Sequence, residues 1–282
     1  MTQSGRRKVF SNFVVFLCGA SVVVALIPLV FIFFYVIKQG FSSLNWDFFT
    51  KMPKPVGEKG GGMANAIVGT LILIAIASGV AIPIGLIAGV YLSEYRRARF
   101  AELVRFTADV LNGVPSIVIG IFAYGLFVLP VKRFSALAGG IALGFMMIPI
   151  ITRTTEELLN LVPSSLREGA LALGATRARA AFSVMVPAAL PGIITGILVA
   201  LARISGETAP LLFTAFSNRF FTTSLRQPIA SLPVQVFTYA IAPYDDWHRQ
   251  AWAGALVLVS VVFVFSVLAR MVTARLERMH KA

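Results

Sequence analysis

The chain has very little of what metal binding, disulfide formation or covalent catalysis requires. It contains one cysteine, Cys18, so no internal disulfide can form. Its two histidines, His248 and His280, are isolated, with no partners at metal-ligand spacing. We therefore expect no metal site, no cofactor bound by this chain and no catalytic residues of its own.

Charged residues are also scarce for a chain of this length. They make up 13% of the 282 residues, whereas about one quarter is typical of soluble proteins. Hydrophobic residues account for 57% of the chain, and the mean hydropathy is +0.84. This composition, with its long apolar runs, indicates an integral membrane protein. The first run is too long for a secretory signal core and lacks a small-residue cleavage site, so we interpret it as a membrane anchor.

Six apolar segments are each long enough to cross a bilayer, which takes about 20 residues. We expect an all-α integral membrane protein with six transmembrane helices. The predicted spans are Phe13–Ile37, Ala64–Leu92, Thr107–Leu129, Ser135–Leu158, Ala188–Phe213 and Trp252–Val272. Around them we expect an N-terminal segment (1–12), an outer loop (38–63), a five-helix domain (64–273) that includes an inner loop (163–187), and a tail (274–282).

The second apolar segment is rich in small residues. It contains Gly69, Gly79, Gly85 and Gly89. Close packing drives the association of membrane helices, and small residues permit it. We therefore expect this segment to approach its neighbours closely.

The glycine-rich run from Gly57 to Gly62 is not a phosphate-binding loop. No Gly-Lys-Ser/Thr sequence occurs there, no strand precedes the run, and the residues after it open a membrane helix. The chain thus shows no nucleotide-binding motif of its own, and we interpret the run as a flexible loop.

Basic residues are distributed unevenly between the two sides of the predicted membrane domain. The net charge of +13 comes without the aromatic-basic interleaving of RNA-binding proteins, so we expect no nucleic-acid partner. If the N-terminus is inside, fifteen Lys and Arg lie inside: Arg6, Arg7, Lys8, Arg96, Arg97, Arg99, Arg105, Arg153, Arg167, Arg177, Arg179, Arg270, Arg275, Arg278 and Lys281. Nine then lie outside: Lys38, Lys51, Lys54, Lys59, Lys132, Arg133, Arg219, Arg226 and Arg249. Because positive charge gathers on the cytoplasmic side, the bias predicts a cytoplasmic N-terminus, tail and loop 163–187.

The loop 163–187 carries a spaced pattern. Glu168, Gly169 and Ala170 are followed after three residues by Gly174, and after nine more by a run that ends at Pro187. Proline is favoured in the first turn of a helix, so Pro163 can open one. Gly174 can take the left-handed backbone that ends or turns a helix. We predict a short helix outside the bilayer, followed by a sharp turn into the next span; a plain surface helix is the simpler alternative.

Two charges lie inside the fifth predicted span. Arg203 and Glu207 are four residues apart, so we expect them to share one helical face. A charge at this depth costs at least about 2.5–3.5 kcal/mol on insertion scales, so it should face a wet path or another helix. We predict that Arg203, Glu207 and Ser205 line a substrate path; a purely structural Arg203–Glu207 ion pair is the alternative.

The third predicted span is interrupted near its middle. Asn112, Pro115 and Ser116 belong to an Asn-Gly-Val-Pro-Ser run that breaks the helical signal. Irregular backbone at membrane depth is tolerated where it is buried or lines a wet cavity. We predict that this break lines the substrate path; a simple proline kink is the alternative.

The loop pattern resembles the EAA loop of binding-protein-dependent ABC importer permeases, with Gly169 in place of an alanine. The wider sequence is similar to the PstA type of permease in phosphate-specific importers. The motifs are NGVPSIVIG (112–120), PIITRTTEE (149–157), the run 167–176, ARISGETAPLL (202–212) and LPVQVFTYA (232–240).

The resemblance implies a type I ABC importer permease fold, also called MetI-like, in a multi-pass protein of the bacterial inner membrane. It implies a PstC-type second permease, a cytosolic PstB-type ATPase dimer that uses ATP and Mg, and a PstS-type phosphate-binding protein outside. In that family the loop 163–187 docks on the ATPase, and an arginine at the position of Arg203 is needed for phosphate passage. Alternatives are a permease for another oxyanion (molybdate, sulfate or phosphonate) or an ATP-independent channel or secondary transporter.

Overall fold

The computed structural model describes residues 3–58 and 60–281. Lys59 lies outside the described residues, as do the side chains of Arg6, Lys8, Arg275, Arg278 and Lys281. All regular structure in the described part is helical. Its elements are α1 (Gln3–Phe41), α2 (Trp46–Thr50), α3 (Ala64–Glu94), α4 (Arg99–Gly113), α5 (Ser116–Ala123), η1 (Tyr124–Val128), α6 (Ala136–Leu161), α7 (Ser164–Ala172), α8 (Arg177–Ala180), η2 (Ala181–Met185), α9 (Val186–Ser205), α10 (Ala209–Thr214), α11 (Leu232–Ala240) and α12 (Asp245–Lys281).

Five described helical segments are long and apolar enough to cross a membrane. They lie in α1, α3, α6, the continuous run Arg177–Ser205 and α12. A sixth crossing requires α4 and the segment Ser116–Val128 to be taken together, although they are bent by 108°. Each predicted apolar segment therefore corresponds to a helical segment, but the third and fifth differ in course from a simple span.

The third segment is not one straight helix from Thr107 to Leu129. α4 ends at Gly113, and the chain turns at Val114 and Pro115 before α5 begins. Pro115 has no backbone N–H to continue the helix, and it disfavours helical angles at Val114. The predicted helix break is confirmed, and α4 and α5 are separate helices.

The fifth segment begins earlier than Ala188 and ends earlier than Phe213. It starts with α8 at Arg177, passes through the π-helical turn η2 and continues as α9 to Ser205. Gly206 caps α9, and α10 starts separately, with Pro210 in its first turn. Glycine at a helix end and proline at a helix start both favour such a break.

The core lies where α3 packs against α6. A Cβ atom at Gly85 would lie 2.7 Å from the Cβ of Ile151, and one at Gly140 would lie 2.5 Å from the Cβ of Ile76. Gly69 and Gly89 also lie against neighbouring segments, so the predicted close approach is confirmed for them. Gly79 differs, because its Cβ position has open space.

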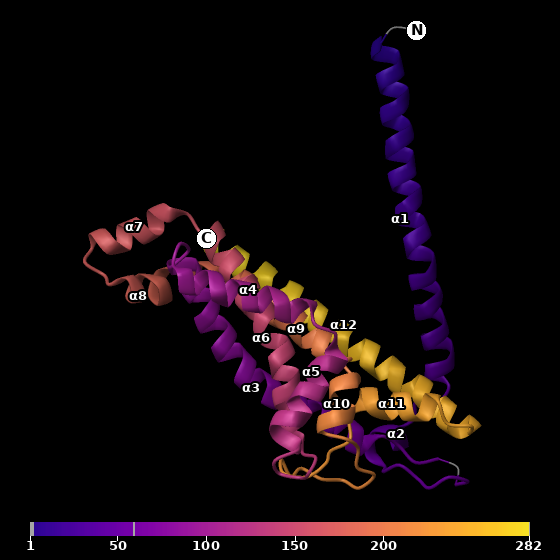
Figure 1. Ribbon diagram of the computed structural model, residues 1–282. Helices are drawn as coiled ribbons and strands as arrows, with labels where there is room; N and C mark the ends of the chain where they lie inside the picture. Colours follow the sequence, from indigo (N-terminus) through magenta and orange to yellow (C-terminus); the bar gives the residue numbers. More distant parts are fainter. Residues whose placement is uncertain (1–2, 59, 282) are drawn as a thin grey trace.

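The helix α1 leaves the rest of the molecule along most of its length (Figure 1). Its C-terminal end contacts α12, where the rings of Tyr35 and Trp252 meet edge to face with centroids 5.2 Å apart. Most of its apolar side chains are exposed. In a bilayer, lipid satisfies such side chains as well as protein does.

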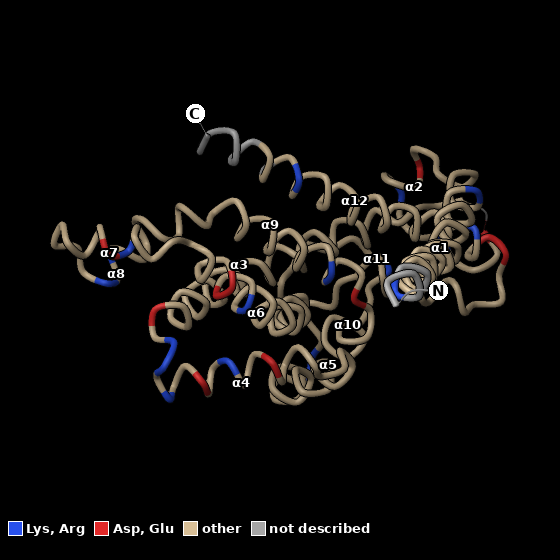
Figure 2. The backbone as a smooth tube through the Cα atoms, turned by 90° about the horizontal axis from the view of Figure 1, so that it is seen from above, with Lys and Arg blue, Asp and Glu red and all other residues tan. Residues whose placement is uncertain are grey.

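The connecting segments gather at two opposite ends of the helices (Figure 1). One end carries α7 and α8. The other carries α2 and the loop between α10 and α11. Charged residues lie mainly at these ends and along α4 (Figure 2). The loop 163–187 therefore lies at the end of the helices opposite to the loop 38–63.

Candidate functional site

The helix α7 stands out from the bundle as an exposed short helix (Figure 1). Pro163 is its N-cap residue, and none of its residues is buried. Gly174 follows it with φ of +83°, a left-handed angle that glycine adopts without steric cost. The predicted short helix and sharp turn are confirmed.

The surface of α7 and its turn is apolar and basic. Leu173 is 90% exposed, and Leu166 is 45% exposed. Arg177 and Arg179 on the adjoining α8 are also exposed. Contiguous exposed apolar surface is typical of protein–protein interaction sites.

The predicted coupling residues themselves make few contacts within the chain. Glu168, Gly169 and Pro187 are exposed, and Ala170 is half-buried. A Cβ at Gly169 would meet nothing within 4 Å. These residues are therefore free to face another protein.

One ion pair fastens this exposed helix to the membrane domain. The guanidinium of Arg167 lies 2.9 Å from the carboxylate of Glu94, at the end of α3. The Glu94 side chain is only 9% exposed, so the pair is shielded from water on that side. The pair therefore links α7 to the end of α3.

Arg203 and Glu207 do not share a helical face. Arg203 lies in the last turn of α9, whereas Glu207 follows the break at Gly206. In the part of the chain that the structure describes, neither side chain has an ion-pair partner. The shared face was predicted on the assumption of a continuous helix, and Gly206 makes that assumption wrong. The alternative of a structural Arg203–Glu207 ion pair is contradicted as well.

Arg203 is exposed on the outside of this chain, and Glu207 is half-buried. Ser205 is buried, and its hydroxyl donates to the carbonyl of Leu201 at 2.6 Å. The Ser205 side chain is therefore not available on the exposed face that carries Arg203. Two charges without partners remain at the end of a membrane-spanning helix.

The two broken spans lie against each other. Gly120 in α5 faces Pro210 in α10, and a Cβ at Gly120 would lie 2.6 Å from the Pro210 Cα. α5 begins directly after the Asn112–Ser116 break, and α10 begins directly after Glu207 and Thr208. Asn112 and Pro115 are exposed, and Ser116 is half-buried. The fold thus brings both interruptions to one region, as in membrane transporters whose substrate sites are formed by discontinuous helices.

Sequence reasoning missed a charge cluster between α4 and α6. The carboxylate of Glu156 is bound on one side by Arg105 at 2.7 Å and on the other by Arg153 at 2.6 Å. Arg153 also contacts Asp109 at 3.0 Å. Glu156 and Arg153 are three apart on α6, which is a sequence signal for the second pair; Arg105 comes from a distant segment, so its pairing has no local signal.

These features define a membrane-spanning transport subunit. It has broken spans in contact, charges without partners at a break, and an exposed helix that a partner can cover. The family model of binding-protein-dependent transport system inner membrane components matches residues 81–278. The chain belongs to this family, and it is an inner membrane component.

Similar proteins agree with this assignment. The chain is 45% identical to the phosphate transport system permease protein PstA of Yersinia pestis, over 91% of this chain and 87% of that protein. It is 43% identical to the protein of the same name from Haemophilus influenzae, over 94% of both. In fold it is similar to a chain of the inward-facing MetNI methionine ABC transporter, with a TM-score of 0.61 and 18% identity over 76% of this chain and 97% of that one. The predicted MetI-like permease fold is confirmed.

Proposed function

We propose that this chain is the membrane-spanning permease subunit of an ATP-driven importer of inorganic phosphate. Relatives named as phosphate transport permeases match nearly the whole chain at 43–45% identity, and this observation carries the proposal. The chemistry of the broken fifth span agrees with an anionic cargo. The chain itself makes and breaks no bond, and ATP hydrolysis belongs to a partner.

The exposed guanidinium of Arg203 suits a phosphate ion in transit. Arginine stays charged at any physiological pH and presents a planar fork of donors that matches two phosphate oxygens. Because no carboxylate among the described residues occupies that fork, an incoming anion does not have to displace one. Glu207, across the break, offsets part of the positive charge, so a bound anion can also leave.

The exposure of Arg203 has a further consequence. A guanidinium facing lipid would be costly, so the face of α9 that carries it must be covered by protein or water. A second permease of PstC type would supply that cover and close the path between the two chains. The helix break at Asn112, Pro115 and Ser116 would lie along the same path.

Energy enters through α7 in this proposal. A dimer of PstB-type ATPase subunits, which uses ATP and Mg, would cover the exposed leucines and α8 arginines on the cytoplasmic side. Glu168, Gly169, Ala170, Gly174 and Pro187 form the proposed coupling loop. The Arg167–Glu94 ion pair would carry the motion into α3. A phosphate-binding protein of PstS type would deliver the ion at the opposite end.

The proposal is tested by uptake into proteoliposomes that contain the complete importer and its binding protein. We expect labelled phosphate to be transported only when ATP is present on the side of the liposome membrane that carries the ATPase subunits. Unlabelled sulfate, molybdate and phosphonate in excess should not reduce it. Uptake of one of these ions in preference to phosphate would contradict the assigned cargo. Phosphate flux without ATP would contradict the importer assignment.

A further inference from the structure

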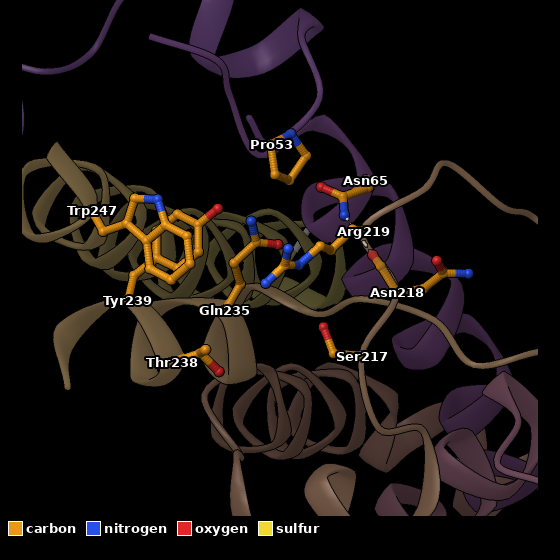
Figure 3. A pocket seen from close by; sticks show the side chains of 9 residues that line it. All are labelled: Pro53, Asn65, Ser217, Asn218, Arg219, Gln235, Thr238, Tyr239 and Trp247. Atoms are coloured by element: carbon orange, nitrogen blue, oxygen red, sulfur yellow. Dashed lines mark hydrogen bonds between the residues drawn. The ribbon is translucent and has the colours of Figure 1, made fainter. Parts of the chain in front are cut away.

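A small polar cavity lies at the end of the molecule opposite α7 (Figure 3). Its volume is about 50 Å³, and its walls come from the segment after α2, the first turn of α3, the loop after α10, α11 and the start of α12. Asn65 lines it, whereas the far end of the same helix, at Glu94, pairs with Arg167. α3 has 31 residues, so these ends are roughly 45 Å apart.

The cavity contains a buried acceptor without a partner. Asn65 is only 4% exposed. Its Nδ2 donates to the carbonyl of Asn218 at 2.8 Å, which fixes the orientation of the carboxamide. Its Oδ1 is buried and accepts no hydrogen bond. Figure 3 shows this oxygen on the side of the cavity. A buried oxygen left without a donor destabilises the fold, so a ligand that donates a hydrogen bond there is favoured.

A positive charge lies in the same cavity. Figure 3 shows the guanidinium of Arg219 extending toward the carboxamide of Gln235. No described carboxylate forms an ion pair with Arg219. Its charge reaches Tyr239: burial raises the pKa of that phenol, while Gln235 and Arg219 lower it in part. Arg219 is exposed and has no hydrogen-bond or ion-pair partner among the described residues, so its N–H donors are available to an anion.

The rest of the wall is uncharged. The rings of Tyr239 and Trp247 stack with centroids 4.4 Å apart and planes 14° from parallel. Gln235 is 6% exposed. A volume of 50 Å³ has room for about three or four water molecules or one small tetrahedral ion.

These groups select an anion that also carries a hydroxyl. The arginine fork binds anionic oxygens, and Asn65 Oδ1 requires a donor. Monohydrogen and dihydrogen phosphate satisfy both, because each has P–O⁻ oxygens and at least one P–OH. Arsenate shares this chemistry. Sulfate at neutral pH has no hydroxyl, so it would leave Asn65 Oδ1 without a donor.

We propose that this cavity is a second binding site for hydrogen phosphate, at the outer mouth of the permease and separate from Arg203. This second site rests on the proposed function of phosphate import, and it adds a binding site that selects its own ligand. Arg219 binds the anionic oxygens of the ion, and Asn65 Oδ1 accepts a hydrogen bond from its P–OH group. An ion released by the binding protein would occupy this site before it enters the path.

The test measures equilibrium binding of labelled phosphate to the assembled importer in nanodiscs, without the binding protein. All samples carry Arg203→Gln, which removes the path arginine from the signal. We expect Arg219→Gln to weaken the remaining binding by at least about tenfold, because a charge-assisted fork is lost. The matched control is Arg226→Gln, an exposed arginine of the same loop that lines a different hollow. It should leave binding unchanged.

Competition distinguishes hydrogen phosphate from a general anion or from water alone. We expect arsenate to displace labelled phosphate and sulfate at equal concentration to fail. Equal displacement by sulfate would contradict the role of Asn65. Unchanged binding in Arg219→Gln, or no binding in the Arg203→Gln parent, would overturn the second site. Uptake by the wild-type importer is measured separately. Failure of the binding test therefore does not contradict the importer assignment, and failure of the uptake test does not contradict the second site.

Discussion

At the residue scale, the membrane domain separates its charges into two kinds. Arg105, Arg153 and Glu156 satisfy one another between α4 and α6. Arg203 and Glu207 find no partner within the described residues. Paired charges in a membrane protein hold helices together, whereas unpaired ones are costly and mark a path.

The paired cluster gives a stability prediction. Glu156→Gln removes a buried carboxylate, 5% exposed, that is contacted by two guanidinium groups. We expect the free energy of unfolding to fall by roughly 1–3 kcal/mol. The loss is smaller than for a fully buried pair, because both arginines are partly exposed. Thermal unfolding of the purified complex should show a fall of a few degrees. The matched control is Glu157→Gln, because Glu157 is exposed and adjacent in sequence. Equal melting of both variants would contradict a structural role for the cluster.

Residue-level inference from sequence succeeded where a local rule decides the outcome. Gly174 has the left-handed angle expected at a helix end, and the chain turns at Pro115. It failed where a helix break or a partner far away in the sequence determines which side chains meet. Gly206 separates Arg203 from Glu207, and the contact between Arg105 and Glu156 depends on the packing of α4. The unpaired oxygen of Asn65 is a property of the folded cavity and has no counterpart in the sequence.

At the element scale, the features that bear on transport are the exposed helix α7 and the two broken spans. α7 is linked to α3 by the Arg167–Glu94 ion pair and also contacts η2, and its turn depends on the left-handed angle of Gly174. The six apolar segments were predictable from hydropathy. The 108° bend between α4 and the segment Ser116–Val128 was not, because sequence signals locate a break without giving its angle.

The turn after α7 gives the second prediction. Gly174→Asp places a charged side chain at a φ of +83°, which strains the backbone and redirects α8. We expect phosphate uptake to fall while the partner ATPase still hydrolyses ATP, so that hydrolysis is uncoupled from transport. Parallel assays of uptake and hydrolysis in proteoliposomes measure this. Gly57→Asp is the control, because Gly57 also has a positive φ (+93°) and an open Cβ position but lies in the loop at the opposite end of the molecule. Normal coupling in Gly174→Asp would count against the docking role of α7.

At the scale of the whole molecule, the two ends differ in what they present. One end exposes leucines and arginines on α7 and α8, and the other holds the polar cavity of Asn65 and Arg219. The basic-residue bias predicts that the α7 end is cytoplasmic. The fold fixes which loops share an end of the helices.

Sidedness gives the third prediction. In vesicles that hold a Cys18→Ser permease without the ATPase, we expect Leu173→Cys to react with a membrane-impermeant thiol reagent only when the vesicles are inside-out. Leu225→Cys, in the loop between α10 and α11, should react only in right-side-out vesicles. Both leucines are exposed, so neither site is shielded by this chain. The opposite pattern would invert the predicted topology and separate α7 from any cytosolic ATPase.

The central claim is that a cytosolic ATPase drives phosphate past the unpaired guanidinium of Arg203. The most direct test measures ATP hydrolysis and phosphate uptake together in proteoliposomes that contain Arg203→Gln in the complete importer. The account predicts that the variant inserts, assembles with its ATPase and hydrolyses ATP, while phosphate uptake is abolished. Uptake at the wild-type rate in Arg203→Gln would contradict it.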